Sequence, residues 1–141
     1  MGQSQSIKKV NFEDIQQTIT TNNKYLLINT LTIEEQKCLI KGTISPDKEI
    51  SVINSNLNNT KLRIIIYGKN AADETIYKKY NQLIKLGFYN IYLYPGGVFE
   101  WLLLQDIYGN DNFPTTSFEL DHLKYRAQSA FNYLLENGDI D

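Results

Sequence analysis

The sequence is poor in the residues that often hold small proteins together through disulfides or metals. It contains one cysteine, Cys38, and one histidine, His122. A single cysteine excludes an internal disulfide and fits a reducing compartment, and the two residues are too few for a Cys/His zinc site. We therefore expect a cytoplasmic domain that is stabilised by its apolar core, without a metal or a cofactor.

Two further absences narrow the function. Charged residues make up 21% of the chain and nearly balance, with a formal net charge of −2, which argues against a nucleic-acid binder that works by neutralising phosphates. No apolar run approaches the roughly 20 residues that span a bilayer, and the first residues lack the basic-then-apolar pattern of a secretory signal. At 141 residues and 42% hydrophobic content, the chain is expected to form one globular domain.

Signals for strands and helices alternate along the chain. The run LRIIIY has β-branched residues without polar alternation, which is typical of a central parallel strand covered on both faces. Strands are predicted at residues 24–29, 62–67 and 91–94. Helices are predicted to begin after Asn11, after Ser45 and near Ile76, with a brief helical turn after Thr32 and a stop at Gly87. Such alternation predicts an α/β domain with a mostly parallel sheet.

The C-terminal region has the pattern of one more helix. Thr116 and Glu119 have the spacing of a capping box. Apolar residues follow at helical spacing, at Leu120, Leu123, Ala127, Phe131 and Leu134. Such a stripe needs a surface to cover it, either the flank of the same domain or a second copy in an oligomeric structural protein. We divide the chain into a flexible tail (1–9), the α/β domain (10–113) and a helical extension (114–141).

Three segments in order resemble the rhodanese-like domain, the fold of sulfurtransferases. The run from Gly87 to Gly97, with Trp101 four residues later, is similar to the family's G-F-x-x-V-x-x-x-x-G-G-x-x-x-W ending. Residues 26–29 (LLIN) and 39–44 (LIKGTI) stand where that family has L-I-D-V-R and H-I-P-G-A-I. The resemblance covers roughly residues 10–105 and implies a three-layer domain, with a parallel sheet between helices.

The same resemblance implies a nucleophilic cysteine directly after the central strand, and this chain has glycine there. The loop reads Gly68, Lys69, Asn70, Ala71, Ala72, Asp73 and Glu74. Glycine supplies no sulfur to carry the transferred group, and the two carboxylates would repel anionic substrates. No Cys-x5-Arg loop for phosphatase chemistry occurs in the sequence. We therefore predict an inactive member, a pseudoenzyme that serves as a binding or scaffold module for a protein partner.

Two enzymatic alternatives stay open at this point. Cys38 is the only thiol and thus the only candidate for a relocated nucleophile in sulfur transfer. The 68–74 loop could also bind an anion through Lys69 and free backbone N–H groups. For Cys38 we favour an inert structural thiol, and for His122 a surface position near a helix start.

The first six residues form a motif outside the domain. Met1-Gly2-Gln3-Ser4-Gln5-Ser6 matches the M-G-x-x-x-[ST] pattern for N-myristoylation, with Lys8 and Lys9 behind it; the alternative is a polar tail that matches by chance. One myristoyl chain binds membranes with only about 10⁴ M⁻¹. The motif thus predicts a weak, reversible attachment to a cytosolic membrane face.

This tail gives a direct test. Co-expression with an N-myristoyltransferase should add one fatty acyl group to Gly2, seen in the intact mass, and Gly2→Ala should abolish the addition. An unmodified mass from a eukaryotic host would contradict the membrane tether.

Overall fold

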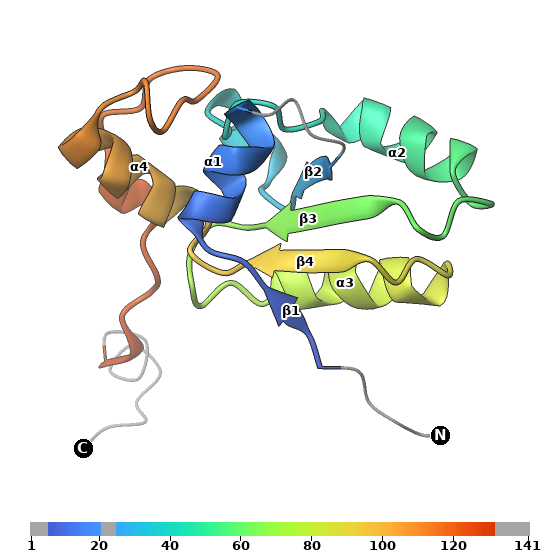
Figure 1. Cartoon of the computed structure of the whole chain (residues 1–141). Coiled ribbons are helices and arrows are strands. Elements are labelled where there is room, and N and C mark those ends of the chain that lie inside the picture. Colours follow the sequence, from blue (N-terminus) through green and yellow to red (C-terminus); the bar gives the residue numbers. More distant parts are fainter. Residues whose placement is uncertain (1–5, 21–24, 132–141) are drawn as a thin grey trace.

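The computed structural model describes residues 6–20 and 25–131. Its centre is a four-stranded, all-parallel sheet in the order β1-β4-β3-β2 (Figure 1). The strands are β1 (Lys8–Lys9), β2 (Tyr25–Asn29), β3 (Arg63–Tyr67) and β4 (Ile91–Tyr94). The three predicted strands are therefore confirmed, and LRIIIY supplies a central strand with neighbours on both sides.

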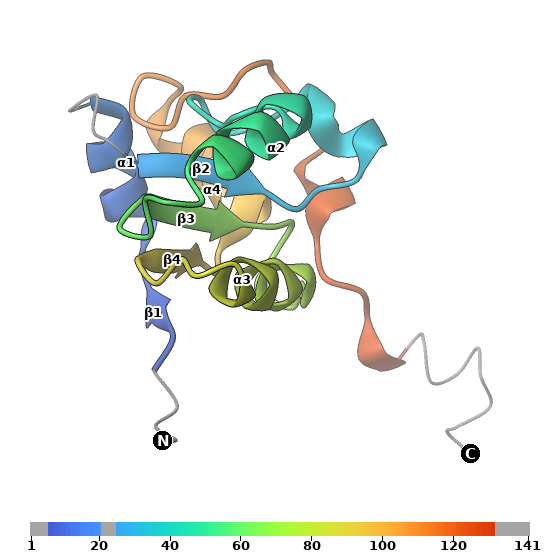
Figure 2. The ribbon, with the colours of Figure 1, turned by 90° about the vertical axis from the view of Figure 1, so that its right-hand side faces the viewer.

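Four α-helices cover the two faces of the sheet. They are α1 (Phe12–Thr20), α2 (Pro46–Ser55), α3 (Thr75–Lys85) and α4 (Gly97–Tyr108), with 3₁₀ turns at η1 (Ile33–Lys37) and η2 (His122–Tyr125). α2 and α3 pack on one face and α1 and α4 on the other (Figures 1 and 2). Because side chains alternate along a strand, Ile64 and Ile66 face the first layer while Ile65 and Tyr67 face the second. The predicted three-layer α/β architecture is confirmed.

The predicted capping residues start their helices. The Asn11 side chain accepts a hydrogen bond from the Asp14 N–H at 3.1 Å, and the Asp14 carboxylate accepts one from the Asn11 N–H at 3.0 Å. Ser45 caps α2 through the Lys48 N–H, with Pro46 in the first turn. Gly87 follows α3 with a φ of +105°, a left-handed conformation that glycine adopts readily.

Two elements were not predicted. β1 consists of Lys8 and Lys9, which pair with Tyr92 and Leu93 of β4. Two exposed lysines carry no strand signal. Lys8 and Lys9, which fall in the tail predicted from the sequence, form the edge strand of the sheet. α4 was missed because it is apolar on nearly all sides, with Trp101 fully buried, and so lacks the periodic pattern of a half-exposed helix.

The prediction of a helix from Thr116 is wrong over residues 116–129. Over these residues the chain forms bends, irregular segments and η2, and helix begins only at residue 130. Thr116 accepts a hydrogen bond from the Leu39 N–H at 3.0 Å, and the Ser117 hydroxyl donates to the Lys37 carbonyl at 2.7 Å. These bonds to the domain replace helical ones. Tyr125, outside the predicted stripe, is buried, whereas Leu120 is 90% exposed; Leu134 lies outside the described residues.

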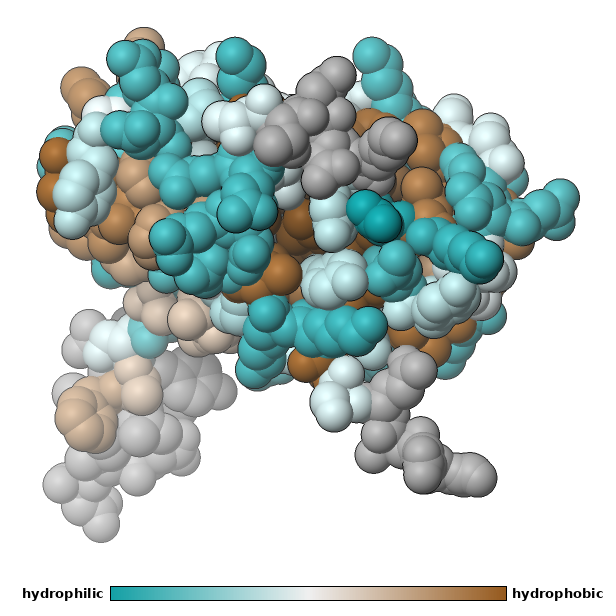
Figure 3. All heavy atoms as spheres, in the orientation of Figure 1, coloured by the Kyte–Doolittle hydropathy of each residue, from teal (hydrophilic) through white to brown (hydrophobic). Residues whose placement is uncertain are grey.

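Exposed apolar side chains lie on α4, at Leu103, Ile107 and Tyr108, and Figure 3 shows apolar surface on the side of the molecule where α4 lies. Further exposed apolar side chains lie in the C-terminal segment, at Phe118, Leu120, Leu123 and Phe131. None of the helices in the described ranges combines the length and the apolar character that crossing a bilayer requires.

Two phenylalanines test this packing. Phe113 is 3% exposed and its ring lies 5.0 Å from that of Trp101, whereas Phe131 is 73% exposed. Phe113→Ala should lower the free energy of unfolding by about 3–5 kcal/mol through the cavity it leaves. Phe131→Ala, the matched control, should change it by less than about 0.5 kcal/mol. Urea denaturation measures both, and a large loss from Phe131→Ala would show that this residue is buried in solution.

Candidate functional site

The candidate site lies at the carboxyl edge of the sheet, where ligands bind in open parallel α/β domains. The loop of residues 68–74 follows β3 there and leads into α3. It is flanked by Thr30, after β2, and by the glycine pair Gly96-Gly97, after β4. The three parts are brought together because β2, β3 and β4 run in parallel and therefore end at the same edge.

The turn after β4 holds the loop in place. The Val98 N–H donates to the Gly68 carbonyl at 3.0 Å and the Phe99 N–H to the Lys69 carbonyl at 2.9 Å. Gly97 has a φ of +66°, and a Cβ there would lie 2.6 Å from the Gly68 oxygen. The glycine of the G-G motif is therefore required by this close approach of two backbones.

Asp73 closes the loop from inside. Its Oδ2 accepts a hydrogen bond from the Lys69 N–H at 2.8 Å, and its Oδ1 accepts bonds from the Thr75 N–H at 3.0 Å and the Thr75 hydroxyl at 2.6 Å. A Cβ on Gly68 would lie 2.5 Å from Asp73 Oδ2, where something must shift. The carboxylate thus takes the space that a side chain at position 68 would need. Glu74, the next residue, is exposed and makes no capping hydrogen bond.

The charge of this carboxylate is stabilised by its partners. Partial burial would raise the pKa of Asp73, but the hydrogen bonds from Thr75 and from the Lys69 N–H outweigh it and hold the pKa below its usual value. The Lys69 ammonium lies 2.7 Å from a Glu35 carboxylate oxygen, so this cation is already paired. A negative charge therefore faces the position where an active relative would hold a thiolate.

The backbone of the loop bonds largely to the loop itself. Asn70 is buried; its Oδ1 accepts from the Ala72 N–H at 2.9 Å, and its carbonyl accepts from the Asp73 N–H at 3.1 Å. Its Nδ2 donates to the Tyr125 carbonyl at 2.9 Å, so the C-terminal segment covers the loop. The N–H groups of residues 69, 72, 73 and 75 donate in these bonds, so these four are not available to an anion.

A cavity of about 330 Å³ remains beside the loop. Lys69, Asp73 and Glu35 line it, and Arg126 joins them from the C-terminal segment. Sequence reasoning missed Arg126, because residue 126 was expected on a helix that the structure does not contain. Two carboxylates and two cations leave this cavity without the strong positive potential of an anion site.

Cys38 lies apart from this chemistry. Its side chain is 2% exposed in the core layer that also holds Tyr67, and its thiol donates to the Ser117 carbonyl at 3.3 Å. Burial raises the pKa of Cys38, which keeps the thiol protonated at neutral pH. A buried, protonated thiol is a poor nucleophile, so the geometry disfavours the relocated-nucleophile alternative.

The site departs from the resemblance at a second point, where β2 ends. Asn29 stands where the family has aspartate, and it is buried. Its amide pairs with that of Gln36 through bonds of 2.7 and 3.2 Å, and its Oδ1 also accepts from the Leu31 N–H at 2.9 Å. Sequence reasoning did not find Gln36. A neutral amide pair replaces a charged residue here.

Solved structures resemble the chain, whereas no family model and no curated protein matches it. The Alr3790 protein from Anabaena sp. is 19% identical, with 92% of this chain and 93% of that chain covered and a TM-score of 0.56. The single-domain sulfurtransferase RDL2 of Saccharomyces cerevisiae is 17% identical, covering 80% and 100%, with a TM-score of 0.59. Ygr203w, described as a yeast protein tyrosine phosphatase of the rhodanese family, is 12% identical, covering 88% and 100%, with a TM-score of 0.59.

These likenesses define the class of fold. The chain has the rhodanese-like α/β fold, as the sequence resemblance predicted. Within that fold it carries Gly68 directly after β3, and the Asp73 carboxylate is turned toward that glycine.

The two acids of the loop give a matched pair of variants. Asp73→Ala removes a cap from α3 and should destabilise the protein by about 0.5–2 kcal/mol near pH 6–7, whereas Glu74→Ala should have little effect. Because the folded-state pKa of Asp73 is lowered, its contribution is full above the unfolded value of about 4 and is lost as pH falls through the folded value. Urea denaturation from pH 7 to 3 should show the difference between wild type and Asp73→Ala shrinking below about pH 4, and a constant difference would contradict this role.

Proposed function

We propose that this protein is a catalytically inactive rhodanese-like domain that acts as a binding or scaffold module. One observation carries the proposal: the position that follows β3 is glycine, and the Asp73 carboxylate occupies the space of its missing side chain. Sulfur transfer by a thiol needs an exposed sulfur that is stabilised as an anion. Here the sulfur is absent and the neighbouring charge has the wrong sign.

The enzymatic alternatives have weaker support. A sulfurtransferase through Cys38 would need a buried thiol to reach solvent. RDL2 is described as a sulfurtransferase and Ygr203w as a protein tyrosine phosphatase. The 68–74 loop of this chain has no thiol that could perform either reaction. The oligomeric structural alternative relied on a C-terminal helix that residues 116–129 do not form.

Attachment to a membrane by N-myristoylation is a second part of the proposal. Gly2 lies outside the described residues. Lys8 and Lys9 follow it as the exposed edge strand β1, so an acyl chain on Gly2 would bring two lysines near an anionic membrane surface. Near such a surface each basic residue contributes about 1 kcal/mol of attraction.

A sulfur-transfer assay tests the inactive reading. The purified protein should form no thiocyanate from thiosulfate and cyanide above the uncatalysed rate, and Cys38→Ser should behave identically. Turnover in the wild type that disappears in Cys38→Ser would establish the relocated nucleophile and overturn the proposal.

Gly68→Cys tests the structural reason. The new side chain meets Asp73 Oδ2, and the carboxylate opposes the thiolate, so this variant should stay inactive and react slowly with iodoacetamide. Gly68→Cys/Asp73→Ser removes that carboxylate and should be alkylated faster. Both variants also carry Cys38→Ser, so that mass spectrometry reports the thiol at position 68 alone. Equal alkylation rates, or turnover from Gly68→Cys alone, would show that Asp73 does not block the position.

A further inference from the structure

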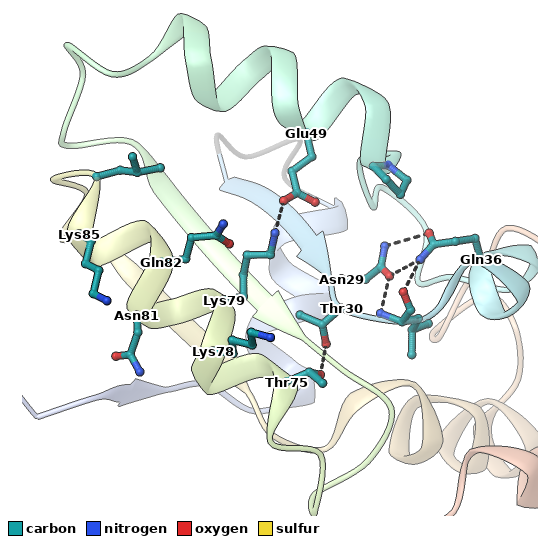
Figure 4. Close-up of a pocket in the computed structure, with 13 residues that line it drawn as sticks. Asn29, Thr30, Gln36, Glu49, Thr75, Lys78, Lys79, Asn81, Gln82 and Lys85 are labelled. Atoms are coloured by element: carbon teal, nitrogen blue, oxygen red, sulfur yellow. Dashed lines mark hydrogen bonds and ion pairs between the residues drawn. The ribbon is translucent and has the colours of Figure 1, made fainter.

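A second, larger hollow lies between α2 and α3, on the face of the sheet that these helices cover (Figure 4). Its volume is about 900 Å³, and we call it the α2–α3 groove. Pro46 and Glu49 line it from α2, and one side of α3 lines it along its length. The groove extends from the carboxyl end of β2 at Asn29 to the end of α3 at Leu86. The proposed function, which rests on the 68–74 loop, assigns no role to this groove.

The charges that line the groove are unequal. Glu49 is the one carboxylate among its lining residues, against Lys78, Lys79 and Lys85. Glu49 is nearly buried, and its carboxylate lies 2.7 Å from the Lys79 ammonium, which reaches across from α3 (Figure 4). That pair is neutral and joins the two walls. Lys78 and Lys85 are exposed, and no described carboxylate pairs with them. The groove therefore has an excess of two positive charges on a protein whose net charge is −2.

The spacing of these two lysines fits a particular ligand. They are seven positions apart in the helix, which is about 10 Å along the axis of α3. In a polyproline II segment, which has three residues per turn and rises about 3.1 Å per residue, side chains three residues apart lie on one side and about 9 Å apart. Asn81 and Gln82 line the groove between the lysines, and their amides offer both donors and acceptors, as a peptide backbone does.

We infer that the α2–α3 groove binds an acidic segment of a partner protein in the polyproline II conformation, with two carboxylates three residues apart on Lys78 and Lys85. This rests on the proposed function, because a domain without chemistry of its own acts through what it binds. Two lysines are too few for a duplex nucleic acid, whose binding neutralises many phosphates, and fewer than the four to eight basic residues of lipid-binding clusters. The amides between them favour a peptide over either.

The test uses the full chain and a fluorescein-labelled octapeptide of serine and glycine that carries two glutamates three positions apart. Fluorescence anisotropy should show binding that weakens as salt rises. Lys78→Glu/Lys85→Glu should weaken it by about tenfold or more. The matched control, Lys41→Glu/Lys61→Glu, changes the net charge equally at exposed residues outside the groove and should stay within about twofold of wild type. A peptide with lysines in place of the glutamates should not bind.

Each contrary result has a defined meaning. Equal loss in both double variants would show attraction by net charge alone, and no binding of the acidic peptide by wild type would overturn the inference. Tighter binding of anionic vesicles or of single-stranded RNA, lost in Lys78→Glu/Lys85→Glu, would assign the groove to that class instead. Thermal unfolding of each variant confirms that it is folded. If the peptide does not bind and no sulfur transfer is seen, the proposed inactivity stands and only the groove inference fails. If sulfur transfer is seen, the proposed inactivity is overturned whether or not the peptide binds.

Discussion

The carboxylate of Asp73 determines what the loop after β3 can be. Its oxygens accept hydrogen bonds from Lys69 and Thr75, so one side chain both shapes the loop and caps α3. In doing so it fills the space beside Gly68. The N–H groups of Lys69 and Thr75 are thus bonded to an anion of the protein itself. One side chain thus stabilises the loop and fills the space beside Gly68.

The loop keeps its shape because the neighbouring turn is bonded to it. Val98 and Phe99 donate to its carbonyl groups, and this requires glycine at position 97. The C-terminal segment adds a third support through the Tyr125 carbonyl and Asn70. The 68–74 loop is therefore held in shape from two neighbouring segments.

The two surfaces differ in how their charges are used. Around the loop, Lys69 is paired with Glu35 and Asp73 with backbone donors, so little charge is left to attract a ligand. In the α2–α3 groove, the Glu49–Lys79 pair leaves Lys78 and Lys85 unopposed. Because unpaired exposed charge can steer and orient a partner whereas paired charge contributes little, the groove is the better candidate for recognition.

Most of the fold could be read from local patterns. LRIIIY is buried on both faces and had to be a central strand, and Asn11, Ser45 and Gly87 mark helix ends by chemistry that acts within a few residues. The absence of sulfur at position 68 follows equally from the sequence, since a strand end and the next residue identify the position. β1 and α4 carry no such local pattern. β1 consists of two lysines that pair with the backbone of β4, and α4 is apolar on nearly all sides.

Contacts between distant residues decided the rest. Residues 116–129 have helical periodicity, yet Thr116 and Ser117 bond to Leu39 and Lys37, about 80 positions earlier; tertiary hydrogen bonds overcame a weak local preference. The Asp73 side chain points into the loop because it bonds to Lys69 and Thr75. The sequence alone does not show which donors a carboxylate will bond to. The ion pair of Glu49 with Lys79 joins two helices across a sheet face. Lys78 and Lys85 therefore stay unpaired because of how these helices pack, since tertiary packing decides which charges become neighbours.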